Sequence, residues 1–377
     1  MRIATDFEGA RIDVLSAESP SNVRLAVPAD PKHAKFRMWF AFAVEDAADE
    51  ALSVAIENAG SCTWPRAWTD YQVCASHDGQ TWTRVPTVYA DGVLRFTDTP
   101  RGPRSLYAYY APYSNAAIDG LIARAEAAGA RARSLVETPG GHHVSLVEIG
   151  NLDPGAPALW IVAQQHPGEH MAGHWVDGFV ERLLSDDDDA RKLRSEACVA
   201  LVPRMNPDGV ALGAHRTNAA GIDLNRQWLA PEGAAPEVGA VRAAMLARGC
   251  AFFLDVHGDE TLPYVFVQGA EGVPMRTPWM VGLEAAFCEA FRAASPDFQT
   301  EYGYPKDPPG QGNLRIASNW AADTFDALSY TLEMPFIDNA NAPDPELGWS
   351  TERSRALGAA MVTTLARMLP KLGGKRT

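Results

Sequence analysis

The residues best suited to chemistry in this chain are two histidines and a glutamate that follow apolar segments. His166 and Glu169 belong to the sequence His-Pro-Gly-Glu, just after the apolar segment 158–163, and His257 follows a second apolar segment, 251–256. Imidazole nitrogens and carboxylate oxygens are usual zinc ligands, and a catalytic zinc needs three protein ligands and one open position. We therefore expect one Zn²⁺ per chain, bound by His166, Glu169 and His257.

Residues 166–170 also spell His-x-x-Glu-His, a pattern that in one class of zinc hydrolase places both histidines on one helical face. Here Pro167 and Gly168 directly follow His166. Proline is tolerated only in the first turn of a helix, and glycine weakens a helix. We therefore expect His166 in a loop, with His170 and His174 on the following helix as residues that do not bind the metal.

Further polar clusters follow in order along the chain. Arg216 and Arg226 lie in the segments 215–218 and 221–226, and a planar guanidinium matches a carboxylate. Glu333 ends a strand-like stretch, where a carboxylate beside a metal could take a proton from water. Taken alone, the two arginines would be interpreted as members of surface salt bridges, and Glu333 as a structural residue.

The elements that must position these residues alternate between strand-like and helix-like patterns. This alternation predicts an α/β fold, a mixed-sheet α/β/α catalytic domain over residues 116–377, with its site at the ends of buried strands. The acidic run 186–189 is expected to be a solvated helix end or loop. The expected strands are 144–149, 158–163, 197–203 and 251–256, and the expected helices are 119–132, 172–184, 279–294 and 354–369.

Residues 1–115 have a different pattern, with short stretches rich in β-branched and aromatic residues between turn signals. An antiparallel β-sandwich domain is expected there, and nothing in it looks catalytic. Its expected strands are 37–44, 51–57, 71–75 and 93–97.

Composition narrows the classes of partner. The formal charge of −14 argues against a broad nucleic-acid surface, which would need a basic face. No apolar run is long enough to span a bilayer, and the first residues contain no apolar signal-peptide core, so we expect a cytoplasmic protein with no membrane partner. The five cysteines form no Cys-x-x-Cys pair, which argues against a disulfide framework. The sequence leaves the oligomeric state open.

Six ordered motifs, HPGE, NPDG, HRTN, GIDLNR, DVHG and YTLE, resemble the zinc metallocarboxypeptidases of the carboxypeptidase A type, most closely the cytosolic branch. The resemblance implies that His166, Glu169 and His257 bind zinc and that Asp223 orients His166. It further implies that Arg216 stabilises the oxyanion and that Glu333 is the general base. Asn225 and Arg226 would hold the terminal carboxylate of the substrate.

The resemblance is less direct at two points. The family usually has a mobile tyrosine, for which Tyr302 and Tyr304 are candidates, and the cytosolic branch has a basic pocket residue, for which Arg315 is the candidate. We therefore expect a zinc-dependent carboxypeptidase that acts on peptide or protein C-termini, with a preference for acidic C-terminal residues. The alternatives are a zinc amidase or deacylase acting on N-acyl amino acids or cell-wall peptides, and a non-catalytic peptide-binding protein.

Overall fold

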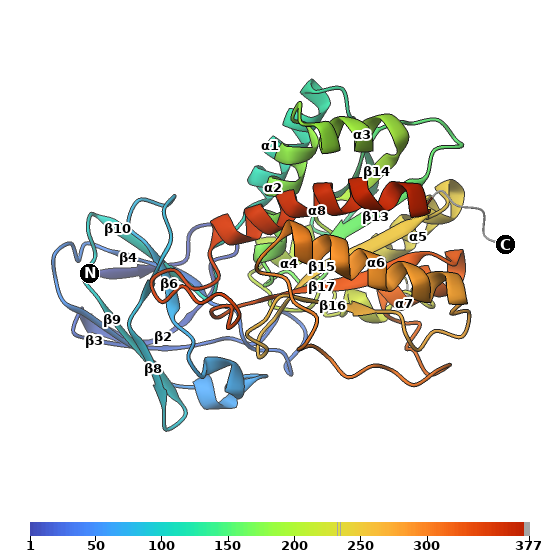
Figure 1. Cartoon of the computed structure of the whole chain (residues 1–377). Helices are drawn as coiled ribbons and strands as arrows, with labels where there is room; N and C mark the ends of the chain where they lie inside the picture. Colours follow the sequence, from blue (N-terminus) through green and yellow to red (C-terminus); the bar gives the residue numbers. More distant parts are fainter. Residues whose placement is uncertain (232, 234, 373–377) are drawn as a thin grey trace.

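The computed structural model describes residues 1–231, 233 and 235–372, which form two lobes side by side (Figure 1). The N-terminal lobe consists of two five-stranded sheets, in the orders β1-β4-β10-β6-β7 and β2-β3-β5-β9-β8. The paired strands are antiparallel except for β3 and β5, which are parallel. The strands are β1 Arg2–Ala4, β2 Asp13–Ser19, β3 Asn22–Ala26, β4 Ala41–Glu45, β5 Leu52–Ile56, β6 Val73–Ser76, β7 Thr83–Val85, β8 Thr87–Ala90, β9 Val93–Asp98 and β10 Arg104–Ala108.

The second lobe is built on a seven-stranded mixed sheet in the order β11-β12-β14-β13-β15-β17-β16. Its central strands β14, β13, β15 and β17 are parallel, and the outer pairs are antiparallel. The expected α/β fold with an N-terminal β-sandwich is confirmed. The strands are β11 Arg131–Glu137, β12 His143–Gly150, β13 Ala158–Ala163, β14 Cys198–Val202, β15 Phe252–Asp259, β16 Phe266–Gly269 and β17 Leu328–Pro335.

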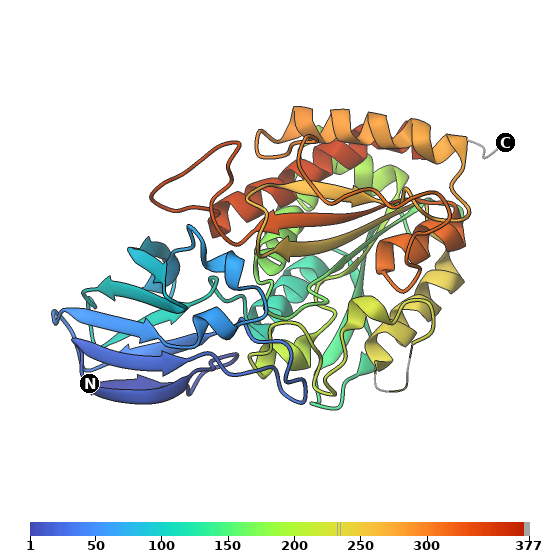
Figure 2. The ribbon, with the colours of Figure 1, turned by 90° about the horizontal axis from the view of Figure 1, so that it is seen from below.

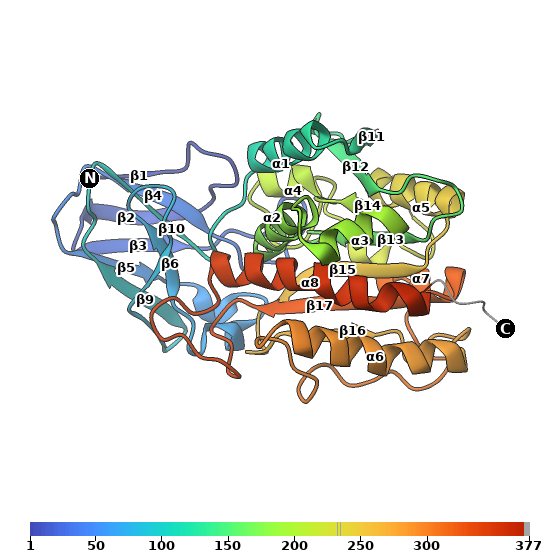
Figure 3. The same cartoon turned by 45° about the horizontal axis from the view of Figure 1, so that its top comes forward.

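Helices cover both faces of this sheet (Figure 3). On β13, Leu159 and Ile161 join the core beneath α2, α3, α6 and α8, whereas Trp160 and Val162 face the core beneath α5 and α7. A strand buried on both faces is therefore apolar throughout. The helices are α1 Asn115–Ala127, α2 Met171–Leu183, α3 Asp188–Glu196, α4 Pro207–Ala211, α5 Pro236–Arg248, α6 Pro278–Ala294, α7 Ala317–Phe325 and α8 Thr351–Leu372; short 3₁₀ turns are Ala59–Ser61, Pro65–Trp68 and Leu224–Arg226.

Glycines set the closest helix contact of this lobe, between α2 and α8. A Cβ atom at Gly178 would lie 2.1 Å from the Arg355 carbonyl oxygen, and one at Gly358 would lie 2.0 Å from that of Trp175. Both distances are far below van der Waals contact, so each helix needs a glycine where the other crosses it. This crossing fixes α2, which begins at Met171, two residues after Glu169.

Two expectations about helices need correction or refinement. The helix expected over 119–132 is displaced: α1 begins after Ser114, whose side chain accepts a hydrogen bond from the Ala117 N–H, and β11 begins at Arg131. Gly129, with a φ of +92°, lies between the two elements. In the acidic run, Asp187 caps α3 by accepting a hydrogen bond from the Ala190 N–H, so this run is a helix end, as expected.

Within the residues that the structure describes, no helix is both long enough and apolar enough to cross a membrane.

Candidate active site

Strand pairing places two of the expected site residues side by side. His257 on β15 is the register partner of Glu333 on the parallel strand β17. Paired residues of neighbouring strands project to the same face of a sheet, so the two side chains share one face. Strand β15 extends to Asp259, past the expected end at residue 256, and β17 extends to Pro335. His257 and Glu333 therefore lie within strands and share their rigidity.

The His-Pro-Gly-Glu segment forms the turn between β13 and α2. The Gly168 N–H donates to the His215 carbonyl at 2.9 Å, and a Cβ atom at Gly168 would lie 2.4 Å from His215 Nδ1. Only glycine allows this close approach of the turn to the His215 backbone. Since α2 begins at Met171, His166 lies in the turn and Glu169 just before the helix.

The ligand atoms of His166, Glu169 and His257 converge on one point. His166 Nδ1 lies 2.7 Å from Glu169 Oε1, His257 Nδ1 lies 2.8 Å from Glu169 Oε2, and the two Nδ1 atoms are 3.1 Å apart. All three residues are buried. Two imidazole nitrogens and one carboxylate oxygen are a donor set that fits zinc, with room for water as a further ligand.

Carboxylates lie behind both histidines. His166 Nε2 lies 3.1 Å from Asp223 Oδ1, and His257 Nε2 lies 2.8 Å from Asp255 Oδ2. A carboxylate at the outer nitrogen fixes the tautomer and orientation of an imidazole and makes it a better ligand. The arrangement therefore has both the three ligand residues and the carboxylates behind them that a metal centre with two histidine ligands requires.

Charge and burial act differently on the two central glutamates. Burial alone would raise the pKa of Glu169, but the neighbouring imidazoles of His166 and His257 outweigh it and hold the pKa below the usual carboxyl range. For Glu333, burial dominates and raises the pKa well above that range, although His257 opposes the shift. The surroundings thus favour the ionised form of Glu169, as a metal ligand requires, and give Glu333 a higher proton affinity than an ordinary carboxylate.

A cavity of about 300 Å³ opens beside the three converging residues. Arg216 lines it with its Nε donating to Asp223 Oδ2 at 2.8 Å. The adjacent wall holds Arg226 and Asn225, and the Asn225 side-chain oxygen accepts a hydrogen bond from the Ala317 N–H at 2.8 Å. Two guanidinium groups in one pocket make a local site for anions in a chain whose overall charge is negative.

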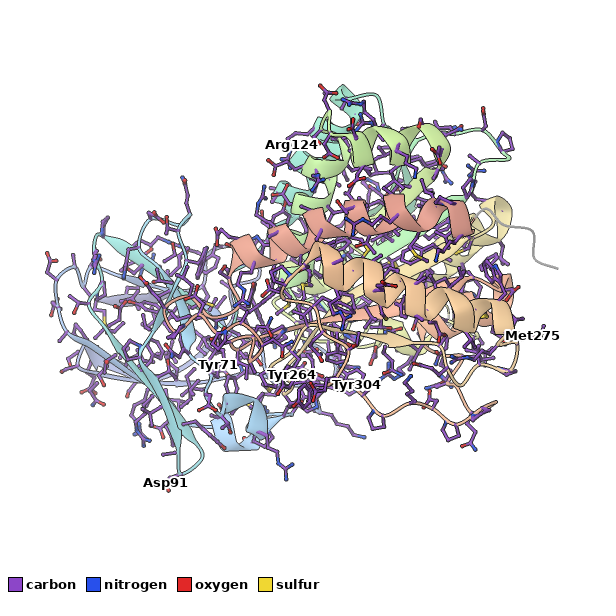
Figure 4. The ribbon with its side chains drawn as sticks, viewed as in Figure 1. Tyr71, Asp91, Arg124, Tyr264, Met275 and Tyr304 are labelled. Atoms are coloured by element: carbon purple, nitrogen blue, oxygen red, sulfur yellow. The ribbon has the colours of Figure 1, made fainter. Side chains whose placement is uncertain are left out.

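Tyr304 closes the side of the cavity next to Glu333. Its hydroxyl donates to Asp259 Oδ2 at 2.5 Å and lies 3.3 Å from Glu333 Oε1. The chain passing Tyr304 also borders a second cavity of about 480 Å³ between β16 and α6. Figure 4 labels Tyr304 at the lower edge of the α/β lobe, and its ring packs edge-on against Phe266 of β16, with ring centroids 4.9 Å apart.

Comparison with known families covers both lobes. Residues 122–341 match the zinc carboxypeptidase family, and residues 3–110 match the cytosolic carboxypeptidase N-terminal domain. This chain belongs to the zinc carboxypeptidase family. The resemblance seen in the six sequence motifs is therefore confirmed, and the protein is a hydrolase of the metalloprotease class.

Relatives of this carboxypeptidase match over almost the whole chain. An uncharacterized protein of Zymomonas mobilis is 40% identical over 375 residues, which are 99% of this chain and 97% of the relative. The metallo-carboxypeptidase from Burkholderia cenocepacia has a TM-score of 0.94 at 42% identity, covering 98% of each chain. The metallo-carboxypeptidase from Pseudomonas aeruginosa, solved in complex with (2-guanidinoethylmercapto)succinic acid, has a TM-score of 0.94 at 40% identity and covers 99% of this chain and 100% of that chain.

The two histidines expected not to bind the metal, His170 and His174, contact the segment that joins the lobes. His170 Nδ1 accepts a hydrogen bond from the Tyr113 N–H at 3.0 Å, and His174 Nε2 lies 3.2 Å from the Ala111 carbonyl oxygen. Burial lowers the pKa of both imidazoles, that of His174 to about 4. Neither belongs to the group of converging ligand atoms.

Two of the candidates suggested by resemblance lie outside the pocket lining. Arg315 is exposed, and its Nε donates to the Arg226 carbonyl oxygen at 3.0 Å. Tyr302 is 47% exposed and stacks on Tyr264, with ring centroids 4.3 Å apart. Of the two tyrosine candidates, only Tyr304 lines the cavity.

Asp255 is the site residue that sequence reasoning missed. It is fully buried, it contacts His257, and its Oδ2 accepts a hydrogen bond from Gln165 Nε2 at 2.6 Å. A signal was present, because residues two apart in a strand share a face and an aspartate within an apolar strand needs a partner. The spacing Asp-x-His in the segment 251–257 could have identified it.

Proposed function

We propose that this carboxypeptidase binds one Zn²⁺ through His166, Glu169 and His257 and removes the last residue from peptide or protein C-termini. The observation that carries the proposal is the convergence of three ligand atoms beside a pocket that also holds Glu333, Arg216 and Arg226. Zinc bound there supplies Lewis acidity toward a water molecule and a carbonyl oxygen.

The protein side chains divide the remaining work of hydrolysis. Glu333 takes a proton from the attacking water as its oxygen adds to the scissile carbonyl carbon. Arg216 donates hydrogen bonds to the oxyanion that develops on the carbonyl oxygen. When the C–N bond breaks, Glu333 passes the proton to the leaving amine. Asp223 and Asp255 keep the two histidine rings in the orientation that ligation needs.

Asn225 and Arg226 are proposed to hold the free carboxylate of the last residue. Arg226 is within the pocket lining, and its fork of N–H donors suits a carboxylate. The ligand of the Pseudomonas aeruginosa relative, a succinic acid derivative, is itself a carboxylic acid, which supports carboxylate recognition by a site of this kind. Binding of the terminal carboxylate would confine cleavage to the last peptide bond.

The preference for acidic C-terminal residues stays a prediction without a pocket residue to carry it. The residue expected to recognise an acidic side chain, Arg315, lies outside the pocket lining. The lining instead includes the neutral polar side chains of Gln268, Ser318 and Thr331. Rates for matched peptides ending in Glu, Gln, Ala and Lys test it. A Glu-terminated peptide that is cleaved no faster than its Gln-terminated partner would remove the acidic preference.

The direct test compares one peptide with a free C-terminus and the same peptide with a C-terminal amide. Mass spectrometry of zinc-loaded protein is expected to show single residues removed in succession from the free peptide, because only that peptide offers the carboxylate for Arg226. The amidated peptide is expected to react at least about a hundredfold more slowly, since the half-buried Arg226 guanidinium would be left without its anion. Equal cleavage of both peptides would contradict the proposal.

Assays with N-acyl amino acids and cell-wall peptides, and a chelator control with the free peptide, separate the alternative functions. A zinc amidase or deacylase would release acyl groups from N-acyl amino acids or cleave cell-wall peptides while leaving ordinary peptide C-termini intact. A peptide-binding protein without activity would show no turnover that a chelator abolishes. Successive trimming that stops when a chelator is added would exclude both.

A further inference from the structure

One buried aspartate links the N-terminal sheets to the pocket. Asp30 lies between β3 and β4 and is 6% exposed. Its Oδ1 accepts a hydrogen bond from the His215 N–H at 2.7 Å, and its Oδ2 accepts from the N–H groups of Arg216 at 2.8 Å and Thr217 at 2.9 Å. The Thr217 hydroxyl adds a fourth bond at 3.1 Å. The backbone of residues 215–217 therefore bends around a carboxylate of the other lobe.

Such a carboxylate is a strong constraint on the backbone that surrounds it. Hydrogen bonds to an ionised acceptor are stronger than those between neutral groups, and buried N–H groups without an acceptor are costly. The neighbouring loops are also close: a Cβ atom at Gly221 would lie 2.8 Å from the Lys32 carbonyl oxygen. The direction in which the Arg216 side chain leaves the backbone is therefore fixed by Asp30.

Two aromatic rings of the N-terminal lobe contact the other end of Arg216. Its guanidinium carbon lies 5.4 Å from the ring centroid of Phe36 and 5.6 Å from that of Trp64. Phe36 in turn stacks on His33, with centroids 4.5 Å apart. Cation–π attraction to the two rings favours this position of the guanidinium.

The third contact of Arg216 is with Asp223, which also contacts the expected metal ligand His166. Its Nε donates to Asp223 Oδ2, while Oδ1 of the same carboxylate lies 3.1 Å from His166 Nε2. Arg216 is thus held by its backbone, by two rings and by Asp223. The backbone and ring contacts come from the N-terminal lobe, which borders this side of the α/β lobe (Figure 2).

We propose that Asp30, together with Phe36 and Trp64, positions Arg216 for catalysis, so that the N-terminal sheets are a working part of the active site. The proposal rests on the proposed function, which assigns Arg216 to the oxyanion. Asp30 is a positioning residue, because it acts through the backbone of Arg216 and does not line the pocket. Losing an oxyanion contact lowers kcat more than it raises KM.

A double-mutant cycle tests whether Asp30 acts through Arg216. The variants are Asp30→Asn, Arg216→Ala and the two combined, assayed for kcat and KM on a peptide with a free C-terminus. Asp30→Asn is expected to lower kcat on the order of tenfold with KM nearly unchanged, since one carboxylate oxygen becomes an N–H donor facing N–H groups. In the Arg216→Ala background the same change is expected to cost less than about twofold.

The matched control is Asp91→Asn, an exposed aspartate of the same lobe at the far tip of the β8–β9 hairpin (Figure 4). It is expected to leave kcat unchanged. Equal loss of kcat from Asp30→Asn in both backgrounds, or no loss in the wild-type background, would overturn the proposal. Should Asp30→Asn fail to fold, Trp64→Leu takes its place in the cycle with the same expected outcome.

A second readout is independent of turnover. Hydrogen exchange of the backbone amides of residues 215–217 is expected to be faster in Asp30→Asn than in the wild type, while exchange in β14 is unchanged. Unchanged exchange at 215–217 would overturn the positioning role. A wild-type protein that trims no peptide would instead defeat the proposed function, and the exchange result would still decide what Asp30 does.

Discussion

The histidines of the candidate centre depend on carboxylates that lie behind them. Asp223 is a neighbour of Arg216 in the sequence motifs, and resemblance to the family was enough to name it. Asp255 precedes His257 by two residues and holds its outer nitrogen at 2.8 Å. Since the outer carboxylate sets the tautomer and basicity of an imidazole ligand, metal affinity is expected to depend on Asp255 as well as on the three ligands.

Asp255→Asn is therefore expected to weaken zinc binding by about 10- to 100-fold, because the amide is a poorer acceptor for the imidazole N–H. Competition with a chromogenic chelator measures the change. Asp153→Asn, at an exposed aspartate of the same lobe, is the control and is expected to bind zinc like the wild type. Unchanged affinity in Asp255→Asn would contradict the role assigned to this carboxylate.

At the scale of elements, apolar patterning predicted the central strands more closely than the helix boundaries. The expected strand 158–163 coincides with β13, since burial on both faces makes its whole length apolar. The expected helix 119–132 failed at its ends, because an alanine-rich composition does not show where Ser114 caps the helix or where β11 begins. The end of β15 was also placed too early, because His257 and Asp259 are polar residues inside a strand.

The crossing of α2 and α8 gives a prediction for stability. Gly358→Ala is expected to lower the free energy of unfolding by about 1–3 kcal/mol, because the new Cβ atom would force the helices apart. Gly282→Ala on α6 is the matched control, since nothing lies within 4 Å of a Cβ atom there. That control is expected to stabilise the protein by about 0.5–1 kcal/mol. Denaturant unfolding measures both, and equal effects of the two changes would refute the packing argument.

The first turn of α5 gives a prediction for pH dependence. Glu237 is buried there, and burial raises its pKa from 4.5 to about 7. A raised carboxyl pKa stabilises the folded protein fully below the unfolded pKa, and that contribution is lost as pH rises from about 4.5 through about 7.

Glu237→Gln cannot ionise and is expected to lose this part of the pH dependence, which amounts to ~1.4 kcal/mol for each unit of pKa shift. Unfolding free energies of the wild type and the variant across that range of pH measure it. Parallel curves for the two proteins would show that Glu237 does not titrate in this way.

At the scale of the whole molecule, the two lobes meet at the active site. The contact between Asp30 and His215 joins residues 185 positions apart, and no pattern within either segment predicts it. For the same reason the sequence motifs identified Arg216 and Arg226 as candidates but did not predict which residues surround them. They also did not predict that Arg315 is exposed to solvent. Contacts set by the packing of distant loops depend on the completed fold. The division into domains at residues 115 and 116 stays a prediction.

The most direct test of the central claim compares the wild type with Glu333→Gln on one peptide with a free C-terminus, with zinc content measured on the same samples. Both proteins are expected to hold one zinc per chain, because Glu333 is not among the proposed ligands. The kcat of the variant is expected to fall by about 10²- to 10⁴-fold, since glutamine cannot take the proton from water. Full activity of Glu333→Gln, or a wild type that trims the peptide without zinc, would contradict the account.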